Sequence, residues 1–310
     1  MTGATILAAI GNTPLVRLRR LAPDNGAEFW VKLEYLNPSG SMKDRMALSM
    51  IEGAERDGLL EPGTTVVEHT GGSTGPALAL ICRAKGHRAR IVISDCFTEE
   101  RMQLMRALGA DLEILPAVEK RGRVTVQDIE NMIARAAELA REPGSYATDQ
   151  FNNRYVVAGH REALGREVWE DTQARVTAFC HGIGTATWLM GVSEALRSRN
   201  PEVQIVGLEP AGSAAIGGGS RGSFAMQGWS GMVPPQFDAA RVDEVWPIED
   251  DQAIELTLRL SQEEGIVAGV STGANVVGAR RLAQQLGPDA VVVTLAVDSG
   301  FKYMSDTPYG

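Results

Sequence analysis

Hydrophobic and polar positions follow two recurring patterns along the chain. Short runs rich in β-branched residues predict strands, and longer stretches with apolar residues every three or four positions predict helices. The expected strands are residues 29–33, 65–68, 90–94, 112–115, 176–180, 204–208 and 290–296. The expected helices lie near residues 44–57, 74–85, 99–108, 125–141, 159–171, 187–199, 250–264 and 273–286. This alternation predicts an α/β fold of mostly parallel twisted sheets flanked by helices.

Two segments interrupt the alternation. At residues 141–145 (R-E-P-G-S), a helix pattern ends in a Pro-Gly turn, which is where we expect a domain boundary. Residues 209–235 carry many glycines and prolines and little periodicity. A loop of that length in a compact protein is more often functional than idle, so we expect it to serve a site.

Charge and cysteine usage narrow the class of protein. The net charge of −9 argues against a nucleic-acid backbone as the main partner. The three cysteines are odd in number and, like the four histidines, lack metal-ligand spacing, so no metal site is expected. Reduced thiols, no signal-peptide pattern and no apolar run long enough for a bilayer predict a cytoplasmic protein without a membrane partner.

Lys43 stands out in the stretch N-P-S-G-S-M-K-D-R (37–45). It follows the turn residues Pro38 and Gly40 and precedes an apolar-periodic run, which places it in the first turn of a helix. The positive end of the helix dipole disfavours its protonated form, and such an amine is predisposed to attack a carbonyl. The alternative is a solvated lysine beside Asp44.

Three further loops follow predicted strands, where parallel α/β sheets bind ligands. Residues 69–75 (H-T-G-G-S-T-G) offer backbone N–H groups and hydroxyls at a helix N-terminus, which suits a carboxylate. Residues 182–187 (G-I-G-T-A-T) form a short cradle for one phosphate, and match neither a Walker motif nor a dinucleotide fingerprint. At residues 297–300 (V-D-S-G), either Asp298 or Ser299 would face a ligand. Each loop could alternatively be a structural turn. Together, Lys43 and these three loops offer the groups that would bind pyridoxal phosphate (PLP).

Taken together, the sequence motifs of the chain resemble those of a known family. The matching stretches are residues 10–18 (I-G-N-T-P-L-V-R-L), 31–45, 70–75, 182–187, 269–275 (G-V-S-T-G-A-N) and 298–300. They span nearly the whole chain in the order found in the cysteine synthase and cystathionine β-synthase family, the fold-type-II PLP enzymes. The resemblance implies a large PLP-binding domain of residues 1–38 and 146–310 and a small mobile substrate-binding domain of residues 39–145. It also implies a PLP site in the cleft between them and a homodimer.

The resemblance assigns roles residue by residue. Lys43 would be the Schiff-base lysine and general base, and Ser299 the partner of the pyridine nitrogen. The other cofactor-binding residues would be Ser73, Gly184, Thr185, Ala186 and Thr187. The substrate-binding residues would be Thr70, Gly71, Gly72, Ser73, Thr74, Gln150 and Gly228.

The implied activity is that of a cysteine synthase-type transferase in cysteine biosynthesis. It is PLP-dependent β-replacement on an O-activated serine-type amino acid, through an α-aminoacrylate intermediate that a small nucleophile attacks. A serine hydroxyl cannot act as a counter-ion to the pyridine, so the ring would be a moderate electron sink. The alternatives are a β-eliminating lyase or dehydratase, and a low-turnover PLP-binding protein that acts through a partner.

Several positions depart from the family pattern. The anion loop reads T-G-G-S-T-G where the family usually has T-S-G-N-T-G, and Trp188 replaces a threonine after the phosphate cradle. Trp229 stands where small or aliphatic residues are usual, and Phe97 stands in a segment that often carries methionine. We expect these two aromatics to lie beside the route of the second substrate and to shift its identity.

Overall fold

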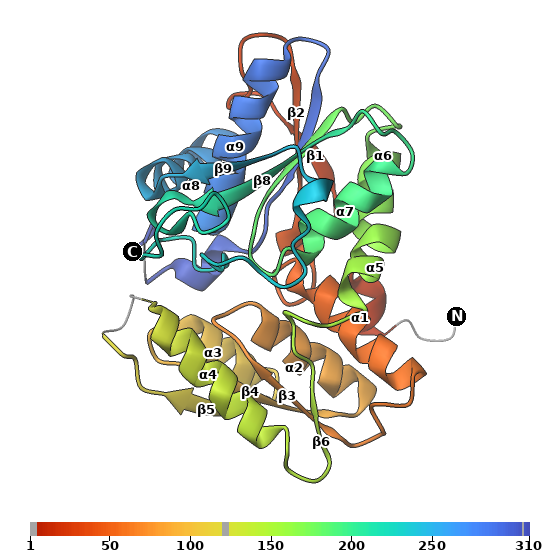
Figure 1. Ribbon diagram of the computed structural model, residues 1–310, viewed down its shortest axis with the longest axis vertical. Helices are drawn as coiled ribbons and strands as arrows, with labels where there is room; N and C mark the ends of the chain where they lie inside the picture. The colour runs from red at the N-terminus through yellow and green to blue at the C-terminus, as the bar shows by residue number, and fades with distance from the viewer. Residues whose placement is uncertain (1–4, 120–123, 306) are drawn as a thin grey trace. The chain divides into compact units, whose positions relative to one another are not determined.

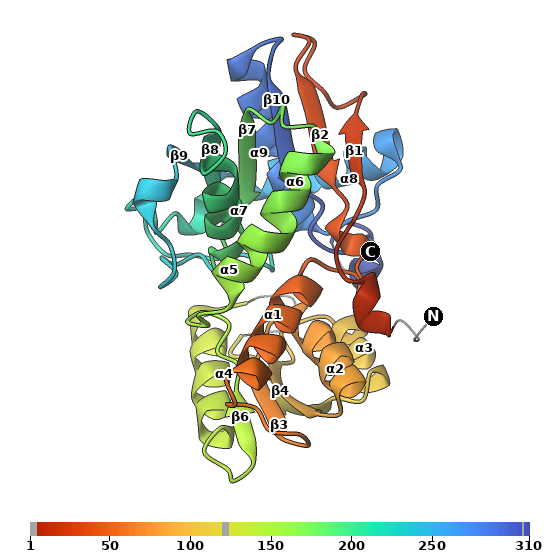
Figure 2. The same cartoon turned by 90° about the vertical axis from the view of Figure 1, so that its right-hand side faces the viewer.

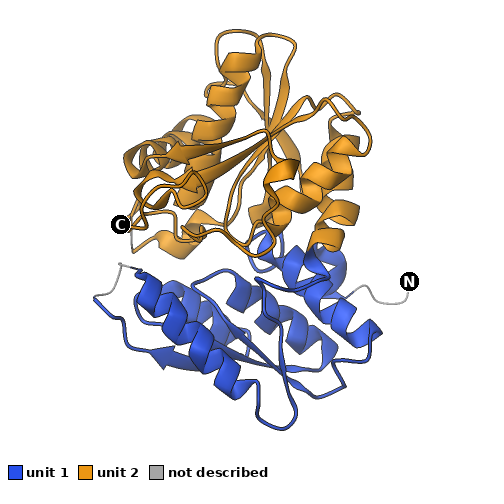
Figure 3. Cartoon of the chain, in the orientation of Figure 1, with its two compact units in different colours: residues 1–10, 37–156 blue, residues 11–36, 157–310 orange. Residues whose placement is uncertain are grey.

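A computed structural model describes residues 5–119, 124–305 and 307–310. The chain divides into two compact units (Figure 3). Unit 1 comprises residues 1–10 and 37–156, and unit 2 comprises residues 11–36 and 157–310. Each unit has its own sheet (Figure 1), so the expected α/β class is confirmed.

Unit 1 contains a parallel sheet of four strands in the order β5-β4-β3-β6. The strands are β3 (Thr65–His69), β4 (Arg88–Ser94), β5 (Asp111–Leu115) and β6 (Ser145–Ala147). The helices are α1 (Lys43–Arg56), α2 (Thr74–Lys85), α3 (Glu99–Ala107) and α4 (Val126–Leu139). Helix α2 covers one face of the sheet and α4 the other (Figure 2), as right-handed crossovers in opposite directions require.

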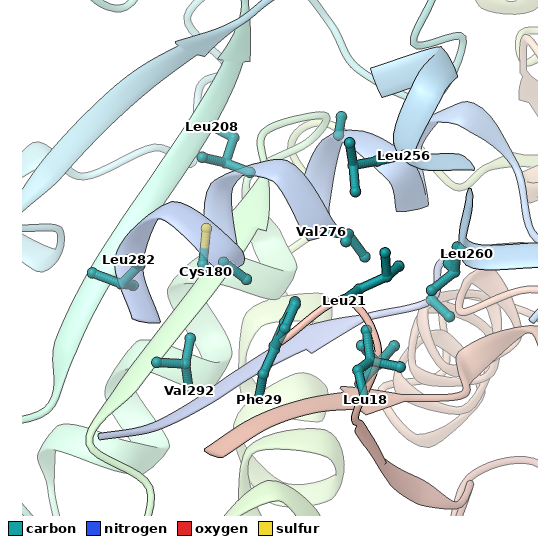
Figure 4. Packing of buried hydrophobic residues seen from close by; sticks show 14 of the residues in the cluster. Leu18, Leu21, Phe29, Cys180, Leu208, Leu256, Leu260, Val276, Leu282 and Val292 are labelled. Carbon is teal, nitrogen blue, oxygen red and sulfur yellow. The ribbon is translucent and has the colours of Figure 1, made fainter. Parts of the chain in front are cut away.

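Unit 2 contains a sheet of six strands in the order β1-β2-β10-β7-β8-β9, in which only the β1–β2 pair is antiparallel. The strands are β1 (Leu15–Leu18), β2 (Glu28–Lys32), β7 (Ala178–Gly182), β8 (Gln204–Pro210), β9 (Glu244–Ile248) and β10 (Val291–Leu295). The helices are α5 (Val156–His160), α6 (Arg166–Asp171), α7 (Thr187–Arg197), α8 (Asp250–Glu264) and α9 (Val270–Leu286). Between the sheet, α8 and α9 lies the hydrophobic core (Figure 4), which includes Phe29, Cys180, Leu208, Val276 and Val292.

The sequence pattern did not predict three of the strands, and all three lie at sheet edges. They are β1, β9 and β6. An edge strand is paired on one side only and tends to be short and interrupted by polar residues or proline, which weakens its sequence pattern. Pro247 within β9 is an example.

The expected domain boundaries also differ from the observed units. The Pro-Gly turn at residues 141–145 ends a helix, but the chain then adds β6 to the sheet of unit 1 and leaves this unit only after Val156. Residues 1–10 belong to unit 1, where η1 (Ile6–Ala9) packs near α2. The expected helix at 159–171 is divided by a π-helical turn, Arg161–Gly165, which apolar periodicity does not reveal.

A buried ion pair anchors the start of unit 2. The Lys32 side chain is 1% exposed, and its Nζ donates to Thr13 O at 2.6 Å and to Asp171 Oδ2 at 2.6 Å. The same atom lies 2.9 Å from Glu167 Oε2, while Glu167 Oε1 accepts from the backbone N–H of Asn12 at 3.1 Å. This network holds the Asn12-Thr13 segment against α6.

We predict that Lys32→Met destabilises the protein by about 3–5 kcal/mol, because it removes the Lys32 ammonium group that lies beside the buried Glu167 carboxylate. Urea unfolding measures the change. The matched control is Arg175→Met, since Arg175 forms an ion pair with Glu28 at 3.1 Å while 48% of its side chain is exposed. That variant should lose less than about 1 kcal/mol. Equal losses would contradict the importance of the buried network.

Candidate active site

Lys43 is the first residue of α1, as the sequence predicts, and its side chain is buried. The turn before it is fixed by Asp44, whose carboxylate accepts from the Ser39 N–H at 2.7 Å and also bonds the Ser39 hydroxyl. The backbone N–H of Lys43 donates to Ser41 Oγ at 3.2 Å. Burial at a helix N-terminus argues against the alternative of a solvated lysine and favours a chemical role.

The glycine-rich loop at residues 70–75 joins β3 to α2 in unit 1. Thr70 Oγ1 accepts from the Gly72 N–H at 3.0 Å, which closes a tight turn. The Thr74 hydroxyl donates to Gln150 Oε1 at 3.0 Å. Gln150 Nε2 donates to the carbonyl of His69 at 2.9 Å. The structure therefore brings the expected carboxylate loop and Gln150 together.

Glu68 supports this arrangement, although the sequence analysis did not identify it. Its buried carboxylate accepts through Oε2 from the Thr148 hydroxyl at 2.7 Å and from the Gln150 N–H at 3.0 Å. Its Oε1 accepts from the His69 N–H at 3.0 Å. One carboxylate thus ties the segment that carries Gln150 to the strand that carries the loop. The only sequence signal was an acidic residue in an otherwise β-branched run.

The predicted phosphate cradle lies where β7 ends and α7 begins, in unit 2. Ala186 precedes α7 with a φ of +66°. The hydroxyls of Thr185 and Thr187 lie 2.9 Å apart, and both residues are buried. A Cβ atom added at Gly184 would lie 2.6 Å from the Gly228 carbonyl oxygen, so only glycine admits this approach. Backbone N–H groups at the start of an 11-residue helix, with two hydroxyls, suit a phosphate dianion.

The long loop expected to serve a site does lie against the cradle. Gly228 approaches Gly184, and the indole of Trp229 occupies the space where a side chain at Gly182 would stand. Trp229 is buried in the hydrophobic core, and Phe97 is buried against Gly71 in unit 1. Both aromatics therefore pack against glycines of the two loops, and the expectation that they line the route of a second substrate stays a prediction.

Ser299 and Asp298 follow β10, the strand next to β7 in the sheet. The buried Asp298 carboxylate accepts from the Tyr303 hydroxyl at 2.8 Å, and the Asp298 carbonyl accepts from the Gly269 N–H at 3.0 Å. Ser299 Oγ accepts from the Phe301 N–H at 3.3 Å at the start of η6 (Gly300–Tyr303). Since Asp298 is engaged with Tyr303, Ser299 is the better candidate to face a ligand.

The thiols of Cys82 and Cys96 are poorly suited to nucleophilic chemistry. Burial raises the pKa of the Cys96 thiol to about 11 and that of Cys82 to about 12, so neither thiol ionises readily at neutral pH. Within residues 5–119, 124–305 and 307–310, no group of three or more histidine, cysteine, aspartate or glutamate side chains could hold a metal ion. Among the same described residues, no helix is both long and apolar enough to span a membrane.

Several known proteins are similar to this chain over nearly its whole length. A family model described as pyridoxal-phosphate dependent enzyme matches residues 6–298. Cysteine synthase B of Escherichia coli (strain K12) is 40% identical over 308 residues, covering 99% of this chain and 96% of the relative. The O-acetylserine dependent cystathionine β-synthase from Helicobacter pylori superimposes with a TM-score of 0.92 at 31% identity, covering 100% of both chains. An O-ureido-L-serine synthase gives a TM-score of 0.91 at 36% identity, covering 99% of this chain and 95% of the other.

We predict that Ser299→Ala weakens PLP retention more than Asp298→Asn does. The first change removes the hydroxyl proposed to bind the ring nitrogen, for a loss of about 3- to 10-fold in affinity. The second keeps an oxygen that accepts from Tyr303. Dialysis against increasing dilutions of PLP, followed by measurement of bound cofactor, gives both affinities. The reverse ranking would assign the ring partner to Asp298.

Proposed function

Because the chain belongs to the pyridoxal-phosphate dependent enzyme family, we propose that it catalyses β-replacement on an O-activated serine-type amino acid, as a cysteine synthase does. The observation that carries this proposal is the preorganised loop at residues 70–75 with Gln150, which suits an amino-acid carboxylate. The names of the similar proteins support it, since one is a cysteine synthase and another is O-acetylserine dependent. O-acetyl-L-serine is therefore the proposed donor, with sulfide or another small nucleophile as acceptor.

Bound PLP supplies an aldehyde that joins to amines and a ring that withdraws electrons from the α-carbon of the donor. In this proposal the Lys43 amine holds the cofactor and later accepts the α-proton of the donor. The N–H groups of residues 184–187 and the hydroxyls of Thr185 and Thr187 bind its phosphate. Ser299 binds the ring nitrogen through a neutral hydroxyl, so electron withdrawal is moderate and suits loss of a good leaving group from the β-carbon.

The donor carboxylate is proposed to bind the loop of residues 70–74. The Thr70 N–H is bonded to the Val92 carbonyl and the Gly72 N–H to Thr70 Oγ1, so the N–H groups of residues 73 and 74 are the proposed donors to the carboxylate. The Gln150 amide is already oriented by Thr74 and His69 and has N–H capacity left for an anion. Ser73 is proposed to contact the cofactor as well, and Gly228 is proposed to bind the donor. These assignments give unit 1 the main role in substrate binding.

A β-eliminating lyase is the competing function, in which water takes the place of a second substrate. The two functions differ in products. With O-acetyl-L-serine and sulfide, the proposed enzyme forms one cysteine for each acetate released, with little pyruvate. Pyruvate formed in an amount equal to acetate would instead identify a lyase. If neither cysteine nor pyruvate forms, the chain is a PLP-binding protein with little turnover.

We also propose that the protein is a cytoplasmic homodimer. The short helix η1 leaves the Ile6 side chain 51% exposed, and an apolar group there is suited to a partner subunit. The three cysteines are free thiols, as in a reducing compartment. Light scattering at micromolar concentration should give twice the 33.2 kDa chain mass. A monomer mass would overturn the dimer.

We predict that borohydride reduction of the holoenzyme followed by peptide mapping marks Lys43. Lys43→Ala should lose the mark and lower turnover at least about 100-fold, because it removes both the cofactor anchor and the general base. The matched control is Lys85→Ala, since Lys85 Nζ pairs with Glu55 Oε2 at 2.7 Å. That variant should keep the mark. A stable adduct on another lysine in Lys43→Ala would refute the assignment.

A further inference from the structure

Three glycines of the carboxylate loop lie against three side chains spaced four residues apart. They are Gly71 against Phe97, Gly72 against Arg101, and Gly75 against Met105. Arg101 and Met105 lie on α3, and Phe97 immediately precedes its N-cap. Residues four apart share one helix face, so these side chains form a single stripe along the loop. We call Phe97, Arg101 and Met105 the α3 stripe.

The α3 stripe and the loop are complementary in shape. A Cβ atom at Gly71 would lie 2.6 Å from Phe97 Cε1, and one at Gly72 would lie 2.7 Å from Arg101 Nη1. A Cβ atom at Gly75 would collide with Met105 Sδ. The glycines therefore do more than permit a turn, because their missing side chains leave room for the stripe.

Arg101 adds charge to this contact. It is only 2% exposed, and its Nη1 donates to the Gly71 carbonyl oxygen at 2.8 Å. A guanidinium stays protonated in proteins, so a buried positive charge lies beside the loop proposed to bind an anion. The bond also occupies the Gly71 carbonyl, whose partial negative charge would otherwise be able to repel a carboxylate. Buried charges are screened less than exposed ones, so this effect should reach a nearby ligand.

We propose that Arg101 is a positioning residue for the amino-acid donor. Resting on the proposed function, this inference assigns it two tasks: it holds the Gly71 carbonyl so that the loop N–H groups remain available, and its charge strengthens carboxylate binding. Phe97 and Met105 fix the loop on either side. The donor specificity of the enzyme for a free α-carboxylate then depends on α3, a helix that does not itself bind the donor.

The test compares two ligands on the holoenzyme by titration calorimetry. L-serine carries the carboxylate, and L-serinamide lacks it. Arg101→Met should weaken L-serine binding about tenfold, because it removes both the bond that holds the Gly71 carbonyl and the charge beside the carboxylate, and should change L-serinamide binding less than about twofold. Arg101→Lys should fall between wild type and Arg101→Met. In steady-state assays the KM for O-acetyl-L-serine should rise while the KM for sulfide stays unchanged.

The matched control is Arg106→Met on the same helix. The Arg106 side chain is 48% exposed and pairs with Glu99 at 3.0 Å, so its removal should leave both ligands unaffected. Equal weakening of both ligands by Arg101→Met, or no weakening, would overturn the inference. If the wild-type holoenzyme binds neither ligand, the proposed function fails instead.

If the arginine variants do not fold, a second pair of variants tests whether the α3 stripe shapes the loop, which the role of Arg101 requires. Gly71→Ala should weaken L-serine binding at least fivefold, because the new methyl group displaces the loop from Phe97. Adding Phe97→Leu removes the atoms in conflict and should restore most of the affinity. If Gly71→Ala binds L-serine like the wild type, or if Phe97→Leu gives no rescue, the α3 stripe does not shape the loop.

Discussion

Close backbone approach without intervening side chains is the constraint on which both ligand loops depend. Neighbouring groups occupy the space where a Cβ atom would stand at Gly72 in unit 1 and at Gly182 and Gly184 in unit 2. Backbone N–H groups can reach an anion only where no side chain shields them. The glycines thus pack against the scaffold on one side and, in the proposed function, admit a ligand on the other, which makes them intolerant of substitution for two separate reasons.

Buried polar groups hold those loops in place. Glu68 joins β3 to the segment that carries Gln150. In unit 2, Asn275 accepts from the Gly182 N–H at 2.8 Å and donates to the Leu295 carbonyl at 3.0 Å, which links the ends of β7 and β10. A fully hydrogen-bonded buried group fixes its partners more firmly than apolar packing does, because any displacement leaves polar atoms unsatisfied. The buried polar groups that support the two loops, and not the loops themselves, therefore set the loop geometry.

The local features of the site could be predicted from sequence, and its supports could not. Lys43 at a helix start follows from Pro38, Gly40 and a periodic apolar run, and α8 (Asp250–Glu264) begins and ends where its pattern does. Glu68 and Arg101 gave no comparable signal, because their roles depend on residues distant in sequence. The packing of Trp229 against Gly182 gave no sequence signal for the same reason, since the two residues are 47 positions apart.

A crystal structure of the holoenzyme with L-serine would test the central claim most directly. The proposed function predicts phosphate oxygens within about 3 Å of the N–H groups of residues 184–187, with the aldehyde carbon of PLP within bonding reach of Lys43 or the amine of the amino acid. It also predicts the serine carboxylate within about 3 Å of the N–H groups of residues 73 and 74 and of Gln150 Nε2. A carboxylate bound away from that loop, or a phosphate bound away from residues 184–187, would contradict it.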